Sequence, residues 1–139
     1  MRYSASWLAL TAVSLPLGAF AAPVSGQDTG QALFQGACAT CHAAGSPRVL
    51  AGKPLLPDTR AITGADPGPA IRLILHGRQP PPDQRGPWMP GFATTLSDAH
   101  IAALLAWLRQ SAGQPPWPYL AQQVHAARIA GDVGAEARQ

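Results

Sequence analysis

Apolar residues recur at helical spacing in several stretches of the chain, most clearly after Ser97. Ser97 is a preferred N-cap residue, and apolar residues follow it at positions i, i+3, i+4 and i+7. These apolar residues are Ile101, Leu104, Leu105 and Leu108. The pattern predicts an amphipathic helix that ends near residues 110–113.

A first helix is predicted to begin at Asp28. This residue is a good N-cap, with a Gln three residues later, and small or apolar residues recur at helical spacing as far as Cys38. We expect Phe34 on this helix to pack against the helix that follows Ser97. There, Gly30 would let the two backbones approach, and Trp107 would fill the angle between them.

A further helix is predicted between two regions that are typical of loops. Asp66-Pro67 is a cap followed by a proline in the first turn, and apolar residues continue to His76 before Gly77, a common stop signal. Residues 43–66 contain several Gly and Pro, and residues 78–87 include three consecutive prolines. Both regions are therefore predicted to be loops, the second a stiff one.

The first two dozen residues have the pattern of a secretory signal peptide. Arg2 precedes an apolar run over residues 7–20, and Ala19-Phe20-Ala21 is a small-x-small cleavage site. The run is short for a bilayer and Pro16 interrupts it, although an uncleaved anchor remains an alternative. We therefore expect residues 1–21 to be a signal peptide and the protein to be exported to the periplasm.

Charge adds little to this picture. The chain has a formal net charge of +3, and removal of Arg2 with the signal peptide would leave +2 (3 − 1). Lys53 is the single lysine, so nine of the ten basic residues are arginines, and these are scattered along the sequence. We expect no nucleic-acid partner, because nucleic-acid binding needs clustered basic residues.

The chemistry of the chain centres on Cys38-Ala39-Thr40-Cys41-His42. This C-x-x-C-H pattern attaches a c-type haem: the two thiols add to the vinyl groups, and the following imidazole reaches the iron. A dithiol redox site, half of a zinc site or a structural disulfide could also use two such cysteines. However, no strand-like run precedes Cys38, and only two cysteines are present in all.

A second candidate ligand is Met89, the only methionine besides Met1. A thioether is a soft ligand that suits haem iron opposite an imidazole. Pro87 and Pro90 on either side predict a stiff, extended segment that presents the sulfur. The alternative is that Met89 only fills a gap in the core. His76 is a possible rival ligand, although a His in a last helical turn is more often a cap or a surface residue.

Together these residues make the chain resemble the class I c-type cytochromes over residues 29–113. The resemblance implies one haem c attached covalently through Cys38 and Cys41, with His42 as the proximal and Met89 as the distal ligand. It also implies an all-α fold: the small cytochrome c fold, with three main helices around the haem and long loops.

The predicted organisation is a signal peptide over 1–21, a cytochrome c domain over 28–113 and a C-terminal extension of unknown role over 114–139. In related cytochromes a backbone carbonyl in a Pro-x-Leu segment accepts the second ring N–H of the haem-bound histidine. Here Pro47 lies three residues before Leu50. The resemblance therefore leaves open which carbonyl orients His42.

More narrowly, residues 71–77, 89–92 and 96–104 are similar to cytochromes that accept electrons from periplasmic dehydrogenases. We therefore expect a periplasmic electron carrier that is not itself an enzyme. Its partners would be a donor dehydrogenase and an acceptor cytochrome or terminal oxidase, both bound transiently, with membrane contact only through partners or an uncleaved signal. The alternatives are a haem enzyme or a gas or redox sensor with a displaceable Met89, and a component that tethers a dehydrogenase through residues 114–139.

Overall fold

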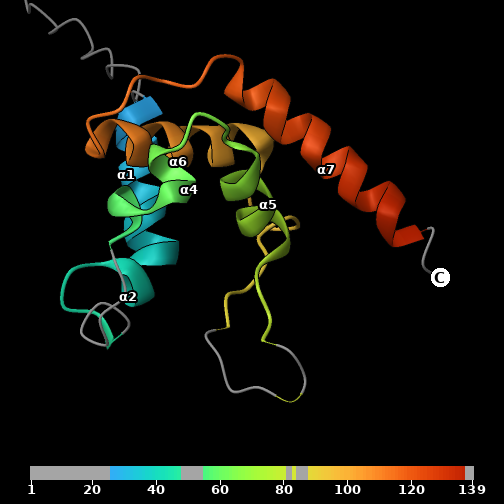
Figure 1. The fold of residues 1–139 in the computed structure, drawn as a ribbon, viewed down its shortest axis with the longest axis horizontal. Coiled ribbons are helices and arrows are strands. Elements are labelled where there is room, and N and C mark those ends of the chain that lie inside the picture. The colour runs from blue at the N-terminus through green and yellow to red at the C-terminus, as the bar shows by residue number, and fades with distance from the viewer. Residues whose placement is uncertain (1–25, 48–54, 81–82, 84–87, 137–139) are drawn as a thin grey trace, which may run out of the picture.

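The computed structural model describes residues 26–47, 55–80, 83 and 88–136. Helices dominate this part of the chain, as the resemblance implied (Figure 1). The predicted signal peptide and most of the proline-rich linker lie outside the described residues. None of the described helices combines the length and the apolar character that a membrane crossing requires.

The first arm of the fold is an almost continuous helix in three parts. It consists of α1 (Gly26–Leu33), a π-helical turn η1 (Phe34–Cys38) and α2 (Ala39–His42). The helix begins two residues before the predicted start at Asp28. The π-helical turn was not predicted, because apolar periodicity does not distinguish a local widening of a helix from the regular form.

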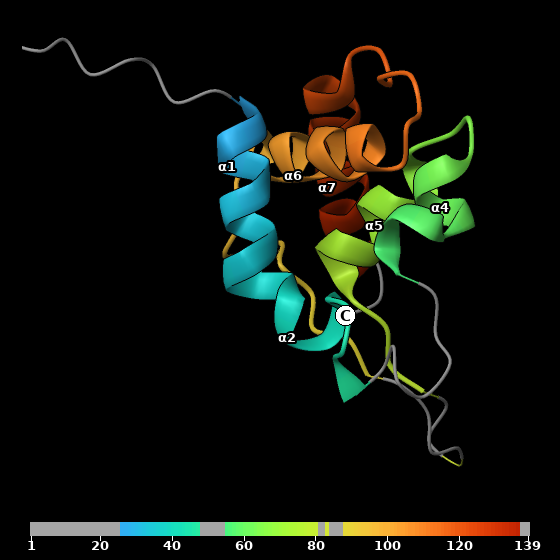
Figure 2. The same ribbon diagram turned by 90° about the vertical axis from the view of Figure 1, so that its left-hand side faces the viewer.

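Helix α6 (Asp98–Ser111) crosses α1 steeply (Figure 2). Its predicted cap is confirmed, because the Ser97 hydroxyl accepts a hydrogen bond of 3.1 Å from the backbone N–H of His100. The predicted crossing contact is also confirmed. The ring centroids of Phe34 and Trp107 lie 5.0 Å apart, and a Cβ on Gly30 would come within 2.5 Å of the Trp107 Cβ.

Two shorter elements lead from the first arm to the next helix. They are a 3₁₀ turn η2 (Leu56–Asp58) and α4 (Arg60–Thr63), both within the stretch predicted to be a loop. Helix α5 (Gly68–His76) follows, and Gly77 ends it as predicted, with a φ of +71°. The N-cap residue is Pro67, one position after the predicted cap, and an Asp66 carboxylate oxygen accepts a hydrogen bond of 2.9 Å from the Gly68 N–H.

The C-terminal extension is part of the folded unit. Helix α7 (Leu120–Glu136) runs along the outside of α5 and α6, and is longer than the weak helical pattern over 119–129 predicted (Figure 1). Trp117, Leu120 and Val124 are buried in the same core as α5 and α6. The described part of the extension, for which the sequence indicated no role, therefore packs onto the domain.

Candidate haem site

A cavity of about 250 Å³ lies between α2, α5, α6 and the segment that carries Met89. Most of its lining is aliphatic, and the four predicted site residues are all part of it. The lining residues are Cys38, Cys41, His42, Leu56, Thr59, Ala61, Ile62, Ala70, Leu73, Ile74, Met89, Leu104, Leu105 and Leu108. The fold therefore brings together Cys38, Cys41, His42 and Met89 from segments about 50 residues apart in sequence.

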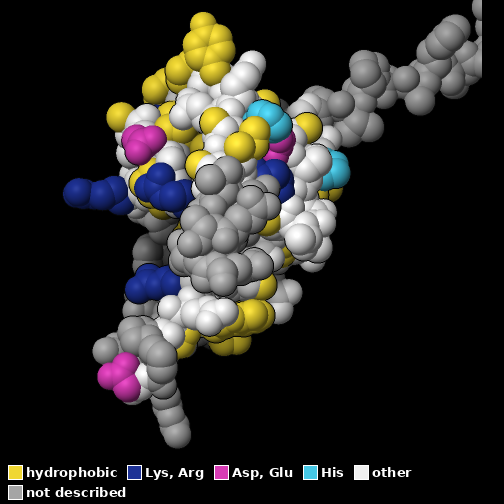
Figure 3. Space-filling view, turned by 90° about the vertical axis from the view of Figure 1, so that its right-hand side faces the viewer, with side chains coloured by type: hydrophobic (Ala, Val, Ile, Leu, Met, Phe, Trp, Pro, Cys, Tyr) yellow, Lys and Arg dark blue, Asp and Glu magenta, His cyan; other side chains and the backbone are white. Residues whose placement is uncertain are grey.

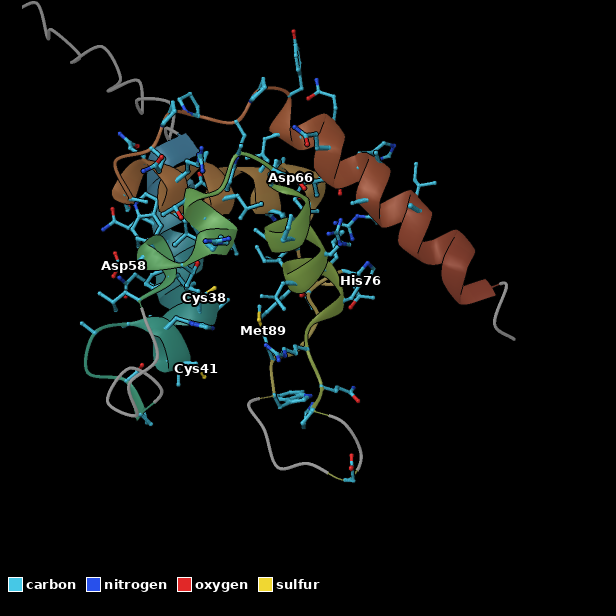
Figure 4. The ribbon with its side chains drawn as sticks, viewed as in Figure 1. Cys38, Cys41, Asp58, Asp66, His76 and Met89 are labelled. Carbon is cyan, nitrogen blue, oxygen red and sulfur yellow. The ribbon has the colours of Figure 1, made fainter. Side chains whose placement is uncertain are left out.

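The two cysteines and His42 form one side of this cavity. Cys38 is the last residue of the π-helical turn, and Cys41 and His42 follow it in α2 (Figure 4). The Ser46 hydroxyl donates a hydrogen bond of 2.8 Å to the Cys41 carbonyl and thereby secures the turn after α2. Burial, with a smaller contribution from Cys41, raises the pKa of the Cys38 thiol to about 11.

Met89 lies on the opposite side of the cavity from Cys38 (Figure 4). Its backbone pairs with Arg78 in an isolated antiparallel bridge, with N–H to carbonyl distances of 2.9 Å in both directions. Three residues further on, the Phe92 N–H donates to the Ile74 carbonyl at 2.8 Å, in the last turn of α5. The Met89 backbone is thus hydrogen-bonded to the segment that follows α5, and Phe92 to α5 itself.

Close backbone packing explains the glycines beside this segment. A Cβ on Gly91 would lie 2.7 Å from the Leu75 carbonyl oxygen, and a Cβ on Gly77 would collide with the Met89 carbonyl oxygen. Larger residues at these positions would therefore push the Met89 segment away from α5. Hydrogen bonds to Arg78 and to α5 fix this part of the segment, while the stiffness expected from the prolines remains a prediction, and Pro87 lies outside the described residues.

These residues fit a haem group. The cavity is open and aliphatic, which suits a flat apolar ring, and its donors are two thiols, an imidazole and a thioether. Among the described residues, no three His, Cys, Asp or Glu side chains gather into another metal site. The rival ligand His76 is exposed and does not line the cavity. The segment expected to supply the carbonyl that orients His42 runs from Pro47 to Leu50, and its residues 48–50 lie outside the described part.

Comparison with known proteins agrees with this geometry. Residues 27–112, more than half of the chain, match the protein-family model described as Cytochrome c. The chain belongs to the cytochrome c family. Membership implies a covalently attached haem c and a role in electron transfer, and the two cysteines of the C-x-x-C-H pattern are present in this cytochrome.

Two curated relatives carry the names of dehydrogenases. One, from Pseudomonas putida, is named as a component of nicotinate dehydrogenase; it is 33% identical over 110 residues, which are 77% of this chain and 9% of that protein. Dihydro-heme d1 dehydrogenase of Pseudomonas aeruginosa is 36% identical over 118 residues, which are 85% of this chain and 22% of that protein. This cytochrome therefore spans less than a quarter of the length of either relative.

Sequence reasoning missed a buried cation behind one wall of the cavity. Arg109 is only 5% exposed, yet it lies on α6 among the apolar residues that line the cavity. Its guanidinium donates to the carbonyls of Ile62, Gly64 and Pro115 and stacks 4.1 Å above the Trp117 ring. The one available signal was an Arg next to an apolar position of a predicted helix, and that pattern is common on helix surfaces.

Proposed function

We propose that this cytochrome is a periplasmic mono-haem electron carrier that takes single electrons from a dehydrogenase and passes them to the respiratory chain. In this proposal residues 1–21 are a signal peptide and residues 28–113 the cytochrome c domain. The acceptor would be another cytochrome or a terminal oxidase. The protein would serve as an electron-transfer partner and would have no substrate chemistry of its own.

The observation that carries the proposal is the shared cavity. Cys38, Cys41 and His42 line one side of it and Met89 lines the other, so a haem held there would have both axial positions filled by side chains. The haem would supply a one-electron redox couple. With both axial positions filled, small molecules would have no open coordination site, which favours electron transfer over catalysis or gas sensing.

Each of these residues has a proposed task. Cys38 and Cys41 anchor the haem covalently, and His42, fixed next to Cys41, supplies the proximal nitrogen. Met89 supplies a soft distal donor, which raises the reduction potential relative to a second nitrogen donor. The aliphatic residues of α5 and α6 exclude water from the ring faces, which also favours a higher potential.

The dehydrogenase partner is inferred from the relatives. Both curated proteins have dehydrogenase in their names, and both share about a third of their residues with this cytochrome over the matched region. Electron-transfer encounters of this kind use small, transient interfaces. On the face shown in Figure 3, basic side chains are spread over several places.

The proposal is tested by comparing the exported wild-type protein with its Met89→Ala variant. Denaturing gel electrophoresis with haem staining should show one haem-bearing band for both proteins. Wild type should also show the weak near-infrared band of methionine-ligated ferric haem. Met89→Ala should lose that band and have a lower reduction potential, because it keeps the thioether links to Cys38 and Cys41 but lacks the distal sulfur.

Three results would contradict the proposal. Haem that is removed by acid-acetone extraction would exclude covalent attachment. A Met89→Ala protein with the wild-type band would assign the distal position to another residue. Avid binding of carbon monoxide by wild type at neutral pH would indicate an open or displaceable position, and so favour the sensor or haem-enzyme alternative.

A further inference from the structure

Helix α7 makes polar contacts with the segment that follows Met89 and with the start of α6. The Arg128 guanidinium donates to the carbonyl of Ala93 and, at 2.8 Å, to the carbonyl of Leu96. Its Nε donates to an Asp98 carboxylate oxygen at 2.7 Å. One side chain of α7 therefore holds both ends of the turn at 93–96 and the first residue of α6.

This turn is the return path of the Met89 segment. Phe92 and Ala93 hydrogen-bond to the carbonyls of Ile74 and Leu75, with distances of 2.8 and 3.2 Å. Arg128 thus binds the chain four residues after Met89, where the segment leaves α5. The hydrogen bonds from Arg128 add to those that the segment makes with α5 and to those within the turn itself.

Helix α7 also contacts the other end of the same segment. A Cβ placed on Gly131 would lie 2.5 Å from the His76 ring, so the two helices pack closely at the last turn of α5. Figure 4 shows His76 on the side of α5 that faces α7, and Met89 on the other side of α5. The segment that carries Met89 begins just after His76 and ends at the turn that Arg128 binds.

We propose that α7 is a clamp for the distal ligand, and that Arg128 is a positioning residue that keeps the Met89 segment against α5. The inference rests on the proposed role of Met89. It assigns a function to the extension beyond residue 112, where the match to the family model ends. Arg128 does not line the cavity, so it acts through the backbone of the turn at 93–96 and through the Asp98 carboxylate.

The test compares Arg128→Met with two matched controls in the full-length, haem-loaded protein. Val124→Ala removes buried apolar volume from the same face of α7, one turn earlier, and leaves Arg128 in place. Arg72→Met removes an exposed arginine from α5. Each variant is assayed for haem staining, melting temperature, the near-infrared band and the affinity of the ferric form for imidazole.

Arg128→Met should keep its covalent haem but show a weaker near-infrared band. Its apparent affinity for imidazole should rise about tenfold or more, because displacement of Met89 no longer has to break charge-assisted hydrogen bonds at the turn. Val124→Ala should melt at a lower temperature than wild type but keep the wild-type band and imidazole affinity. Arg72→Met should match wild type in all four assays.

Two outcomes would overturn the clamp. One is an Arg128→Met protein with the wild-type band and imidazole affinity. The other is a Val124→Ala protein that loses the band as Arg128→Met does, because general destabilisation would then explain both. If Arg128→Met fails to fold, Arg128→Lys takes its place: it keeps the charge without the planar fork, and is expected to raise imidazole affinity as well. A failure of the proposed function would be seen in a different variant: Met89→Ala would then keep the near-infrared band of wild type.

Discussion

The crossing of α1 and α6 can be tested with two alanine substitutions of opposite expected effect. Gly30 lies where the helices meet, and an added Cβ would collide with the Ala103 carbonyl oxygen and lie 2.5 Å from the Trp107 Cβ. Gly36 lies in the π-helical turn of the same arm, and, apart from its chain neighbours and the backbone of its own helix, no heavy atom lies within 4 Å of an added Cβ there. Both substitutions add one methyl group, but only the one at residue 30 places it against another helix.

The magnitudes follow from these distances. Carbon atoms in contact normally lie about 3.5–4 Å apart, so Gly30→Ala forces the helices to separate by about 1 Å. Overpacking of this kind costs about 2–3 kcal/mol, while replacing a helical glycine with alanine returns about 1 kcal/mol. We expect Gly30→Ala to lower the free energy of unfolding by about 1–2 kcal/mol. Gly36→Ala should raise it by about 0.5–1 kcal/mol.

The assay is denaturant unfolding of the haem-loaded variants, followed by far-ultraviolet circular dichroism. The near-infrared band serves as a control that the Met89 side of the site is intact. Because the substitution is the same at both positions, the change in side-chain composition is matched in the comparison. A Gly30→Ala protein that is as stable as Gly36→Ala would show that α1 and α6 are not in the close contact described above.

Two further predictions concern polar contacts outside the cavity. Hydrogen bonds from Arg128, and secondarily from His125, lower the pKa of Asp98, so its stabilising effect is fully present above about pH 4 and is lost as the pH falls through the lowered pKa. Asp98→Asn should therefore be less stable than wild type at pH 7, with a difference that shrinks below about pH 4 in denaturant titrations; a constant difference would refute this. Arg109→Met should lower the free energy of unfolding by about 2–4 kcal/mol, because the buried Ile62 carbonyl and the partly buried Pro115 carbonyl lose their side-chain donor, while the Gly64 carbonyl keeps only the Trp117 ring N–H. If Arg109→Met is as stable as wild type in the same titrations, water replaces the guanidinium as the donor to these carbonyls.

The sequence alone predicted the features that depend on neighbouring residues. Helical spacing after Ser97, the stop at Gly77 and the C-x-x-C-H pattern all lie within short windows, and local backbone geometry or haem chemistry fixes their meaning. The family, the all-α fold and the contact of Phe34 with the helix after Ser97 were predicted from these patterns and the resemblance they support. The haem ligands remain predictions, for which the shared cavity is the structural support.

Tertiary structure decided the features that join distant parts of the chain. The acceptors of Arg109 include the Ile62 carbonyl, 47 residues away, and Arg128 binds carbonyls more than 30 residues before it. Any carbonyl can accept such a bond, so no local pattern identifies the one that a long side chain will reach. The weak helical periodicity of the tail likewise did not indicate that Val124 is fully buried or that α7 touches the Met89 segment. These contacts arise only because α5 and α6 pack together into a surface that α7 can cover.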